Sequence, residues 1–282
     1  MTEDQFHEWL SNPHRPCLLM GVLNVTPDSF SDGGKFYDAA AAIDEARRMS
    51  DQGASIIDIG GESTRPGSQR IEAEEQLRRI MPVFEAIAGR VSAVLSVDTT
   101  RSEVARAAIE CGARIVNDVS AGRDDPLIFP LVAQNRAAMI LMHMQGQPAT
   151  MQVDPRYEDV TQDVKGFLSA RLQVAQAAGI PAQDLLVDPG IGFGKTLWHN
   201  LQLLRELAHL EELGHPIVIG TSRKGFIGRL TDQKEPSDRL IGTAATVAWS
   251  VANGGSIVRV HDVAAMAQVV RIVRAIQSGS ID

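Results

Sequence analysis

The stretch Ala54-Ser-Ile-Ile-Asp-Ile59 is a short apolar run, and residues 73–88 after it carry apolar side chains at helical spacing. A run this short and this apolar is typical of a strand that is buried on both faces. The longer stretch predicts an amphipathic helix. A strand followed by a helix is the unit from which parallel sheets are built, so this pair sets the pattern to look for elsewhere in the chain.

The same unit recurs on both sides of this stretch. Apolar runs cover residues 17–23, 54–59, 93–97, 114–116, 137–142, 185–187, 216–219 and 256–260. Helix-like stretches follow them at residues 38–52, 73–88, 102–110, 127–134, 159–178, 199–213, 237–252 and 262–277. Eight such units within about 250 residues favour one α/β domain, a (β/α)₈ barrel over residues 17–282. Because periodicity does not show whether a sheet closes, an open doubly wound sheet remains an alternative. Residues 1–16 are expected to form a short extension that covers the bottom of the barrel.

Composition excludes several classes of function. The 282 residues carry 27 Lys and Arg against 35 Asp and Glu, a net charge of −8, which argues against nucleic acid or an anionic membrane as partner. Cys17 and Cys111 are too few for a disulfide framework or a cysteine-rich zinc site. The N-terminal residues are acidic where a secretory signal is basic, and no apolar run is long enough to cross a bilayer. We therefore expect a cytoplasmic protein.

Polar residues stand where the apolar runs end. They are Asn24, Thr64, Arg65, Asp98, Asn117, His143, Asp188, Lys224, Arg259 and His261. Any one of them is explained equally well by a turn or a helix cap. In a parallel barrel, however, the carboxyl ends of all strands meet at the face where active sites are built. The set as a whole therefore predicts one site.

The chemistry of these residues divides in two. Asp98, Asn117, Asp188 and Lys224 provide two carboxylates, an amide and a cation, which suits a flat nitrogen-rich heterocycle with several N–H donors. Thr64, Arg65, Arg259 and His261 provide donors and positive charge, which suits phosphate oxygens. Asn24 offers a neutral oxygen to Mg²⁺, which usually binds few protein groups together with substrate phosphates.

Two other sites are disfavoured by spacing. Residues 188–196 end in Gly-Lys-Thr, but a nucleotide-binding P-loop would need glycine where Pro189 stands. His143 and His261 lie far apart in sequence and lack the carboxylate spacing that is typical of zinc.

Nine ordered segments make the chain similar to a known family. They are MGVLNVTPDSFSDGG (20–34), DIGGESTRPG (58–67), SVDT (96–99), NDVSAG (117–122), LMHMQGQPATMQ (141–152), DPGIGFGK (188–195), GTSRKGFIG (220–228), GTAAT (242–246) and RVHDV (259–263). They resemble the bacterial dihydropteroate synthases of the pterin-binding barrel superfamily, and they span nearly the whole chain. The resemblance implies condensation of 6-hydroxymethyl-7,8-dihydropterin diphosphate with p-aminobenzoate, assisted by Mg²⁺, to give 7,8-dihydropteroate and pyrophosphate in folate biosynthesis.

The resemblance also implies roles for individual residues. The pterin would be held by Asp98, Asn117, Met142, Asp188 and Lys224; the diphosphate by Asn24, Thr64, Arg65, Arg259 and His261; and p-aminobenzoate, with which sulfonamides compete, by Phe30, Pro66, Phe193 and Lys224. Asn24 would contact the metal, and Asp98, Lys224, Arg259 and His261 would take part in catalysis. Met142 is equally well read as an ordinary core residue at a strand end.

Two local features qualify this assignment. The loop from Thr26 to Phe36 is rich in Asp, Ser and Gly, and we expect Asp28, Ser29 and Phe30 to form part of a mobile lid over both substrates. Gly225 follows Lys224 where many relatives carry serine, which removes a hydroxyl from the neighbourhood of the p-aminobenzoate carboxylate. Backbone N–H groups of Gly225 and Phe226 would remain as donors.

Alternative functions remain at this stage. A pterin-binding methyltransferase of the same superfamily would share the pterin carboxylates but would not need the loop of residues 24–34 or the Arg-Val-His motif at 259–261. A non-catalytic pterin-binding paralogue would be indicated by losses at Asn24, Arg65, Asp188 or Lys224, all of which are present. The family further implies a homodimer, with the helices at 237–252 and 262–277 as the expected interface.

Overall fold

The computed structural model describes residues 1–26, 39–63 and 67–280 of the chain. Within them, parallel strands close into a barrel in which each strand pairs with its neighbours in chain order and β1 pairs with β8. The strands are β1 (Leu18–Asn24), β2 (Ile56–Gly60), β3 (Val94–Asp98), β4 (Ala113–Asp118), β5 (Ala138–Met142), β6 (Leu185–Asp188), β7 (Ile217–Ile219) and β8 (Gly255–Val260). The predicted (β/α)₈ barrel is confirmed, and the pairing of β1 with β8 excludes the open sheet.

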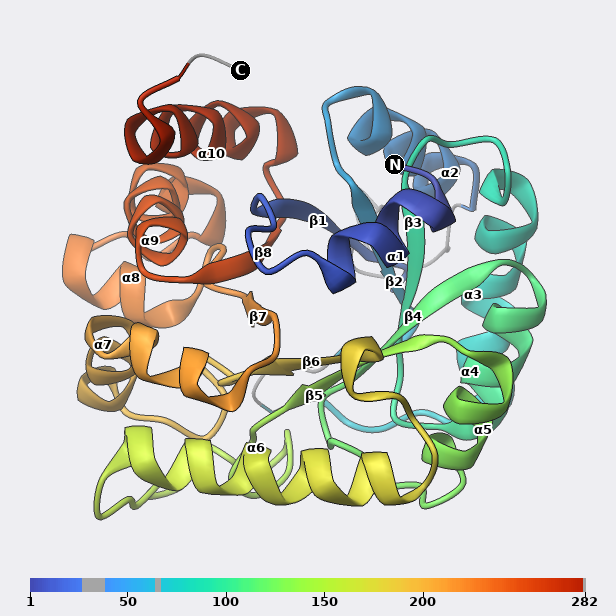
Figure 1. Cartoon of the computed structure of the whole chain (residues 1–282), viewed down its shortest axis with the longest axis horizontal. Helices are drawn as coiled ribbons and strands as arrows, with labels where there is room; N and C mark the ends of the chain where they lie inside the picture. The colour runs from blue at the N-terminus through green and yellow to red at the C-terminus, as the bar shows by residue number, and fades with distance from the viewer. Residues whose placement is uncertain (27–38, 64–66, 281–282) are drawn as a thin grey trace.

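Helices surround the ring of strands (Figure 1). They are α1 (Glu3–Ser11), α2 (Ala39–Asp51), α3 (Ala73–Ile87), α4 (Ser102–Glu110), α5 (Ile128–Asn135), α6 (Val160–Ala177), α7 (Leu197–Arg205), α8 (Gly225–Thr231), α9 (Leu240–Ala252) and α10 (Val263–Ser278). The buried faces of α2 to α10 carry apolar side chains that pack on the outward-facing residues of the strands in one large core.

The structure differs from the predicted helices in two regions. The helix expected over 199–213 is α7 followed by a 3₁₀ helix, η2 (Leu207–Leu213), because the chain tightens to i→i+3 bonding after Glu206. The short helix α8 between β7 and α9 did not appear in the periodic pattern, since its seven residues are too few, although a helix start was expected at Gly225 and Phe226.

The interior of the barrel has two chemically different layers. Alternate residues of a strand point inward, and the lower inward positions are apolar. This lower layer consists of Leu18, Met20, Ile56, Val94, Ile115, Ala138, Ile140, Leu186, Val218 and Ile257. The next inward positions along the same strands are mostly polar and include Asp58, Ser96, Asn117, Asp188 and Arg259. The polar layer therefore rests on an apolar one.

Helix α1 covers the lower end of the barrel. Thr2 and Gln5 form a capping box that starts the helix, and Phe6, Trp9 and Leu10 place three large side chains on one helical face. These side chains are buried against the lower apolar layer. Figure 1 shows α1 lying across the near end of the ring of strands.

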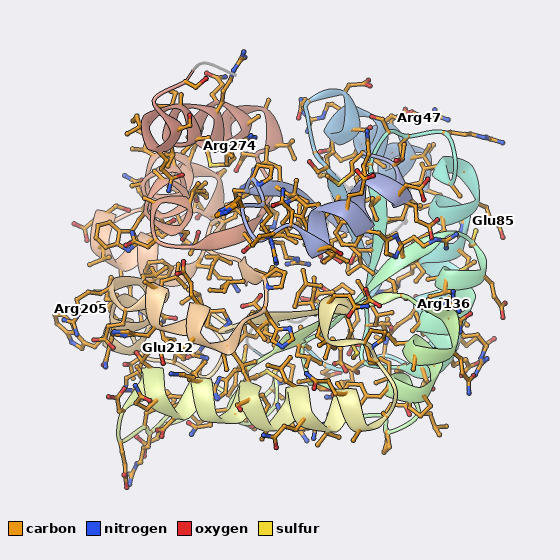
Figure 2. The ribbon with its side chains drawn as sticks, viewed as in Figure 1. Arg47, Glu85, Arg136, Arg205, Glu212 and Arg274 are labelled. Carbon is orange, nitrogen blue, oxygen red and sulfur yellow. The ribbon has the colours of Figure 1, made fainter. Side chains whose placement is uncertain are left out.

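Charged side chains of both signs lie on the outside of the molecule. Arg47, Glu85 and Arg205 extend from its outer edge in Figure 2. Among the described residues, no helix combines the length and the apolar composition needed to cross a membrane.

Candidate active site

One cavity of about 1040 Å³ opens at the carboxyl ends of the strands. Its lining includes nine of the residues that were singled out from the sequence: Asn24, Asp98, Asn117, Met142, Asp188, Phe193, Lys224, Arg259 and His261. The barrel thus brings together side chains from β1, β3, β4, β5, β6 and β8 and from the loops after β6 and β7. His143, which follows β5, is buried and does not line the cavity. The other candidates lie outside the described residues: Asp28, Ser29, Phe30, Thr64, Arg65 and Pro66.

Asp98 lies at the end of β3 and is almost fully buried. Its Oδ2 accepts a hydrogen bond from Nη2 of Arg259 at 2.7 Å. Burial raises the pKa of Asp98 to about 7; the Arg259 charge opposes this rise, and the Asp58 carboxylate adds to it. Near neutral pH, Asp98 is therefore poised between the acid and the carboxylate.

Arg259 is directed differently from the sequence-based expectation. It was grouped with residues for a diphosphate, but its guanidinium bridges two buried carboxylates, with Nε 2.7 Å from Asp58 and Nη2 2.7 Å from Asp98. The reason is electrostatic, because two carboxylates buried side by side repel each other and the Arg259 cation between them offsets that repulsion. Arg259 therefore belongs to the floor of the cavity as much as to its rim.

Asp188 ends β6, and the glycine-rich loop that follows holds it in place. Its Oδ1 accepts from the backbone N–H of Gly190 at 2.6 Å. Gly190 has φ of 67°, and a Cβ there would lie 1.9 Å from the carbonyl oxygen of His143. The loop approaches β5 so closely that only glycine fits, which fixes the carboxylate at the cavity floor.

Lys224 and Phe193 face each other across the cavity wall. The Nζ of Lys224 lies 4.0 Å from the centre of the Phe193 ring, a cation–π contact. A Cβ on Gly192 would lie 3.0 Å from Cδ of Lys224, so the absence of a side chain at this glycine leaves room for the lysine side chain. Burial lowers the pKa of Lys224 to about 8, and the Arg259 charge adds to this effect.

His261 follows β8 and lines the cavity. Burial, together with the charges of Arg259 and Arg223, lowers its pKa to about 3. Its Nδ1 lies 3.0 Å from the Ser222 hydroxyl, which orients the ring. At neutral pH, His261 therefore offers a neutral imidazole to the cavity and adds no positive charge.

Met142 fits both readings that were given for it. It packs with Val119, Met144 and Met151 in a small apolar cluster, and Phe193 lies against that cluster. It also lines the cavity. Its thioether therefore forms part of an apolar wall beside the polar floor.

Sequence reasoning missed two charged residues beside the site. Asp58, in the middle of β2, is fully buried and contacts Arg259 and Asn117. Lys195 lines the cavity, and its Nζ lies 3.0 Å from both Nδ1 of His143 and the carbonyl oxygen of Phe193. The available signal for Asp58 was a carboxylate two residues after Ile56, on the inward face of an otherwise apolar strand.

The donor set suits a metal that arrives with its ligand. Among residues 1–26, 39–63 and 67–280, no group of three or more His, Cys, Asp or Glu side chains is placed to hold an ion. Asn24 contributes one neutral oxygen to the cavity. This is compatible with Mg²⁺, which commonly takes one or two protein ligands and completes its shell with water and phosphate oxygens.

The arrangement combines hydrogen-bond acceptors at the floor with cations at the wall. Asp98, Asn117 and Asp188 suit a ligand edge that is rich in N–H groups. Lys224 and Arg259 supply charge that can stabilise an anion leaving the cavity.

Comparison with known proteins gives a consistent result. Residues 20–261 match the model of the family described as "Pterin binding enzyme". The dihydropteroate synthase of Synechocystis sp. is 46% identical over 258 residues, which cover 92% of this chain and 89% of that protein.

Solved structures agree. The dihydropteroate synthase of Xanthomonas albilineans with 4-aminobenzoic acid superposes with a TM-score of 0.88 at 44% identity, covering 93% of this chain and 94% of that one. The same protein in complex with 7,8-dihydropteroate gives a TM-score of 0.85 at 41% identity, with 93% and 94% covered. The chain described here is a member of the dihydropteroate synthase family of pterin binding enzymes.

Proposed function

We propose that this chain condenses 6-hydroxymethyl-7,8-dihydropterin diphosphate with p-aminobenzoate, giving 7,8-dihydropteroate and pyrophosphate in folate biosynthesis. The observation that carries this proposal is the cavity of about 1040 Å³ in which a floor of acceptors meets a wall of cations, in a chain of this family. A reduced pterin has an edge of N–H donors and carries an anionic leaving group, and the two halves of the cavity match these two features.

The pterin lies on the floor in this proposal. Asp98, Asn117 and Asp188 accept hydrogen bonds from its N–H groups. Lys224 faces the ring oxygen and nitrogen atoms that accept hydrogen bonds. Met142 packs against the ring face. The proposal is supported by the burial of the two carboxylates, since an unscreened carboxylate forms strong hydrogen bonds to a matched donor edge.

The diphosphate lies toward the rim, near Asn24 and His261. Thr64 and Arg65 are proposed to join them from outside the described residues. Asn24 would hold Mg²⁺, which when bound neutralises charge on the departing diphosphate. Arg259 adds a further positive charge next to the bond that breaks.

The second substrate occupies the outer part of the cavity. Phe193 and Lys224 would border p-aminobenzoate and competing sulfonamides, and Phe30 and Pro66 would do so from outside the described residues. The proposed lid residues Asp28 and Ser29 also lie outside the described residues.

The bond change is a substitution at the pterin CH₂ group. The carbon–oxygen bond breaks, and pyrophosphate leaves with the electron pair while the reduced pterin stabilises the cation. The amine nitrogen of p-aminobenzoate then donates its lone pair to the carbon and loses a proton. Since a cation is a strong electrophile, no nucleophilic side chain is required. The protein's contribution is to hold both partners and to stabilise the separated charges.

A direct assay tests the proposal. The purified chain is incubated with the dihydropterin diphosphate, p-aminobenzoate and Mg²⁺, and pyrophosphate and dihydropteroate are measured together. Equal amounts of both products are expected, with the rate reduced by about 10²-fold or more in Asp188→Ala and Lys224→Ala. Val153→Ala, an exposed change on the loop after β5, is the matched control. Binding of the pterin without turnover would instead indicate a non-catalytic paralogue.

We also propose that the protein acts in the cytoplasm as a homodimer. The dimer is supported by exposed apolar side chains on two neighbouring helices, Ile241 and Trp249 on α9 and Ile272 and Ile276 on α10. Exposed apolar surface of this kind is typical of an interface between copies of a chain.

A further inference from the structure

Asp58 lies one layer beneath the cavity. It is in the middle of β2, where it pairs in register with Val22 on β1 and Ser96 on β3. Asp58 faces inward because it lies two residues after Ile56 on the same face of the strand, and Ile56 belongs to the lower apolar layer. The Asp58 side chain is fully buried and is not part of the described cavity lining. Any effect of Asp58 on a ligand must therefore pass through the residues that it contacts.

Three donors converge on this carboxylate. The Ser96 hydroxyl donates to Oδ1 at 2.6 Å. The other oxygen, Oδ2, accepts from Nδ2 of Asn117 at 2.9 Å and from Nε of Arg259 at 2.7 Å. Two of the three donors thus come from side chains that line the cavity.

The contact with Asp58 decides which way the Asn117 amide faces. Only the NH₂ end of an amide can face a carboxylate, because the reverse orientation would bring two lone-pair-bearing oxygens together. With Nδ2 committed to Asp58, Oδ1 points away from it, toward the cavity that Asn117 lines. Among the described residues, no donor reaches this Oδ1. Asn117 is thereby made an acceptor toward the ligand.

The same carboxylate fixes Arg259 at a second point. The guanidinium is held by Nε on Asp58 and by Nη2 on Asp98, and two contacts define the plane of the group where one would leave it free to turn. Asp58 therefore orders one acceptor and one cation of the site at the same time.

We propose that Asp58 is a positioning residue for the pterin: it fixes Asn117 as a hydrogen-bond acceptor and Arg259 in a defined plane beneath the ligand. The identity of the ligand rests on the proposed function, whereas the orientation of Asn117 does not. A different role, in which Asp58 only balances the buried charge of Arg259, predicts no dependence of Asn117 on Asp58.

Substitutions of differing chemistry separate these roles. Asp58→Leu keeps the branched shape but removes both acceptors, and we expect the Kd for 6-hydroxymethyl-7,8-dihydropterin and the KM for its diphosphate to rise about 10- to 100-fold. The KM for p-aminobenzoate is expected to stay within about twofold, since hydrogen-bond losses act locally. Asp58→Asn keeps one oxygen for Asn117 and Arg259 while its new NH₂ group donates to the Ser96 hydroxyl, so the Kd should remain within about fivefold of wild type.

Ser96→Ala is the matched control. It removes a hydrogen bond from Asp58 but not those to Asn117 and Arg259, so the pterin Kd should change by about twofold at most. Circular dichroism and thermal unfolding establish that each variant is folded. A folded Asp58→Leu variant with wild-type pterin affinity, or a Ser96→Ala variant as impaired as Asp58→Leu, overturns the proposal.

Side-chain NMR tests the orientation of Asn117 without any ligand. The Asn117 NH₂ resonances, assigned by their loss in Asn117→Ala, should exchange slowly with solvent in the wild-type protein and in Asp58→Asn. Exchange as fast as that of an exposed asparagine would refute the proposed orientation even if Asp58→Leu did not fold. Because this measurement requires neither pterin nor turnover, it separates a failure of this inference from a failure of the proposed function.

Discussion

Asp98 and Lys224 titrate near neutrality because both are buried at one cavity, with pKa values of about 7 and about 8. Binding a donor edge requires the Asp98 carboxylate, which is lost as the pH falls through 7. Lys224 is needed as an ammonium, which is lost as the pH rises through 8. We therefore expect kcat/KM for the pterin substrate to peak between these values and to fall about tenfold per unit on either side.

Lys224→Arg tests the alkaline limb of this profile. A guanidinium stays protonated across the accessible range, so the decline above pH 8 should disappear while the acid limb remains. If the alkaline limb persisted in Lys224→Arg, it would belong to a group other than Lys224. The measurement is a pH series of initial rates for both proteins in the same buffers.

Gly225 offers a gain-of-contact prediction. A Cβ at this position would meet nothing within 4 Å, and its backbone does not need glycine, so a serine is accommodated. Gly225→Ser adds a donor next to Lys224, and we expect the KM for p-aminobenzoate to fall by about three- to tenfold, one neutral hydrogen bond. Gly225→Ala, which lacks the hydroxyl, is the control and should leave this KM unchanged. A decrease in both variants would assign the effect to the helix rather than to the hydroxyl.

At the residue scale, the sequence predicts which side chains lie together but not their protonation states or their ion-pair partners. Asp98, Asn117 and Asp188 were found because polar residues at strand ends converge in a barrel. The lowered pKa of His261 follows from burial and from the charges of Arg259 and Arg223. The pairing of Arg259 was missed because its partners Asp58 and Asp98 lie far away in sequence. Asp58 was missed because it sits inside a strand rather than at its end.

At the scale of elements, α1 shows how a short helix closes a barrel. Trp9 is 4% exposed, and its indole Nε1–H donates to the carbonyl oxygen of Pro16 at 2.7 Å. We expect Trp9→Ala to lower the free energy of unfolding by about 3–5 kcal/mol, because it removes a large buried side chain and leaves a cavity. Urea unfolding followed by circular dichroism measures the change.

Trp198 provides the matched control for this experiment. It is 75% exposed on α7, so Trp198→Ala should change the free energy of unfolding by no more than about 0.5 kcal/mol. Equal effects of the two substitutions would show that α1 does not contribute to the stability of the barrel.

Most elements were predictable because their patterns are local. Apolar runs located the strands to within two or three residues, for example 137–142 against β5 at Ala138–Met142. Helix ends that depend on tertiary contacts were harder to predict from the sequence. The change from α7 to η2 occurs where Glu206 accepts a hydrogen bond from Thr161, which is distant in sequence.

At the scale of the whole molecule, closure of the sheet was outside the reach of periodicity, because the contact between β1 and β8 joins the two ends of the chain. The number of strand and helix units made a barrel the favoured fold, and only their three-dimensional pairing distinguishes it from an open sheet. The family resemblance predicted the barrel where periodicity could not distinguish it from an open sheet, since the family's motifs span nearly the entire chain.

The assembly prediction also belongs to this scale. Ile241 is 83% exposed and Ile276 is 76% exposed, on helices that pack against each other. We expect the wild-type protein to sediment at about twice the 30.5 kDa chain mass, and the double variant Ile241→Asp/Ile276→Asp to sediment as a monomer, since two buried carboxylates would oppose association. Val153→Asp, a similarly exposed site on the loop after β5, should keep the wild-type mass. A wild-type monomer at all concentrations would contradict the proposed dimer.

In the described part of the chain, the apolar layer and α1 close the lower end of the barrel, and the cavity opens at the carboxyl ends of the strands. Two ligands that enter through the same opening must bind in order, because the ligand that binds deeper has to enter first and leave last. If the pterin binds in the inner part of the cavity, a bound p-aminobenzoate blocks its entry. Steady-state kinetics should therefore show ordered binding, with the pterin substrate first, rather than random binding.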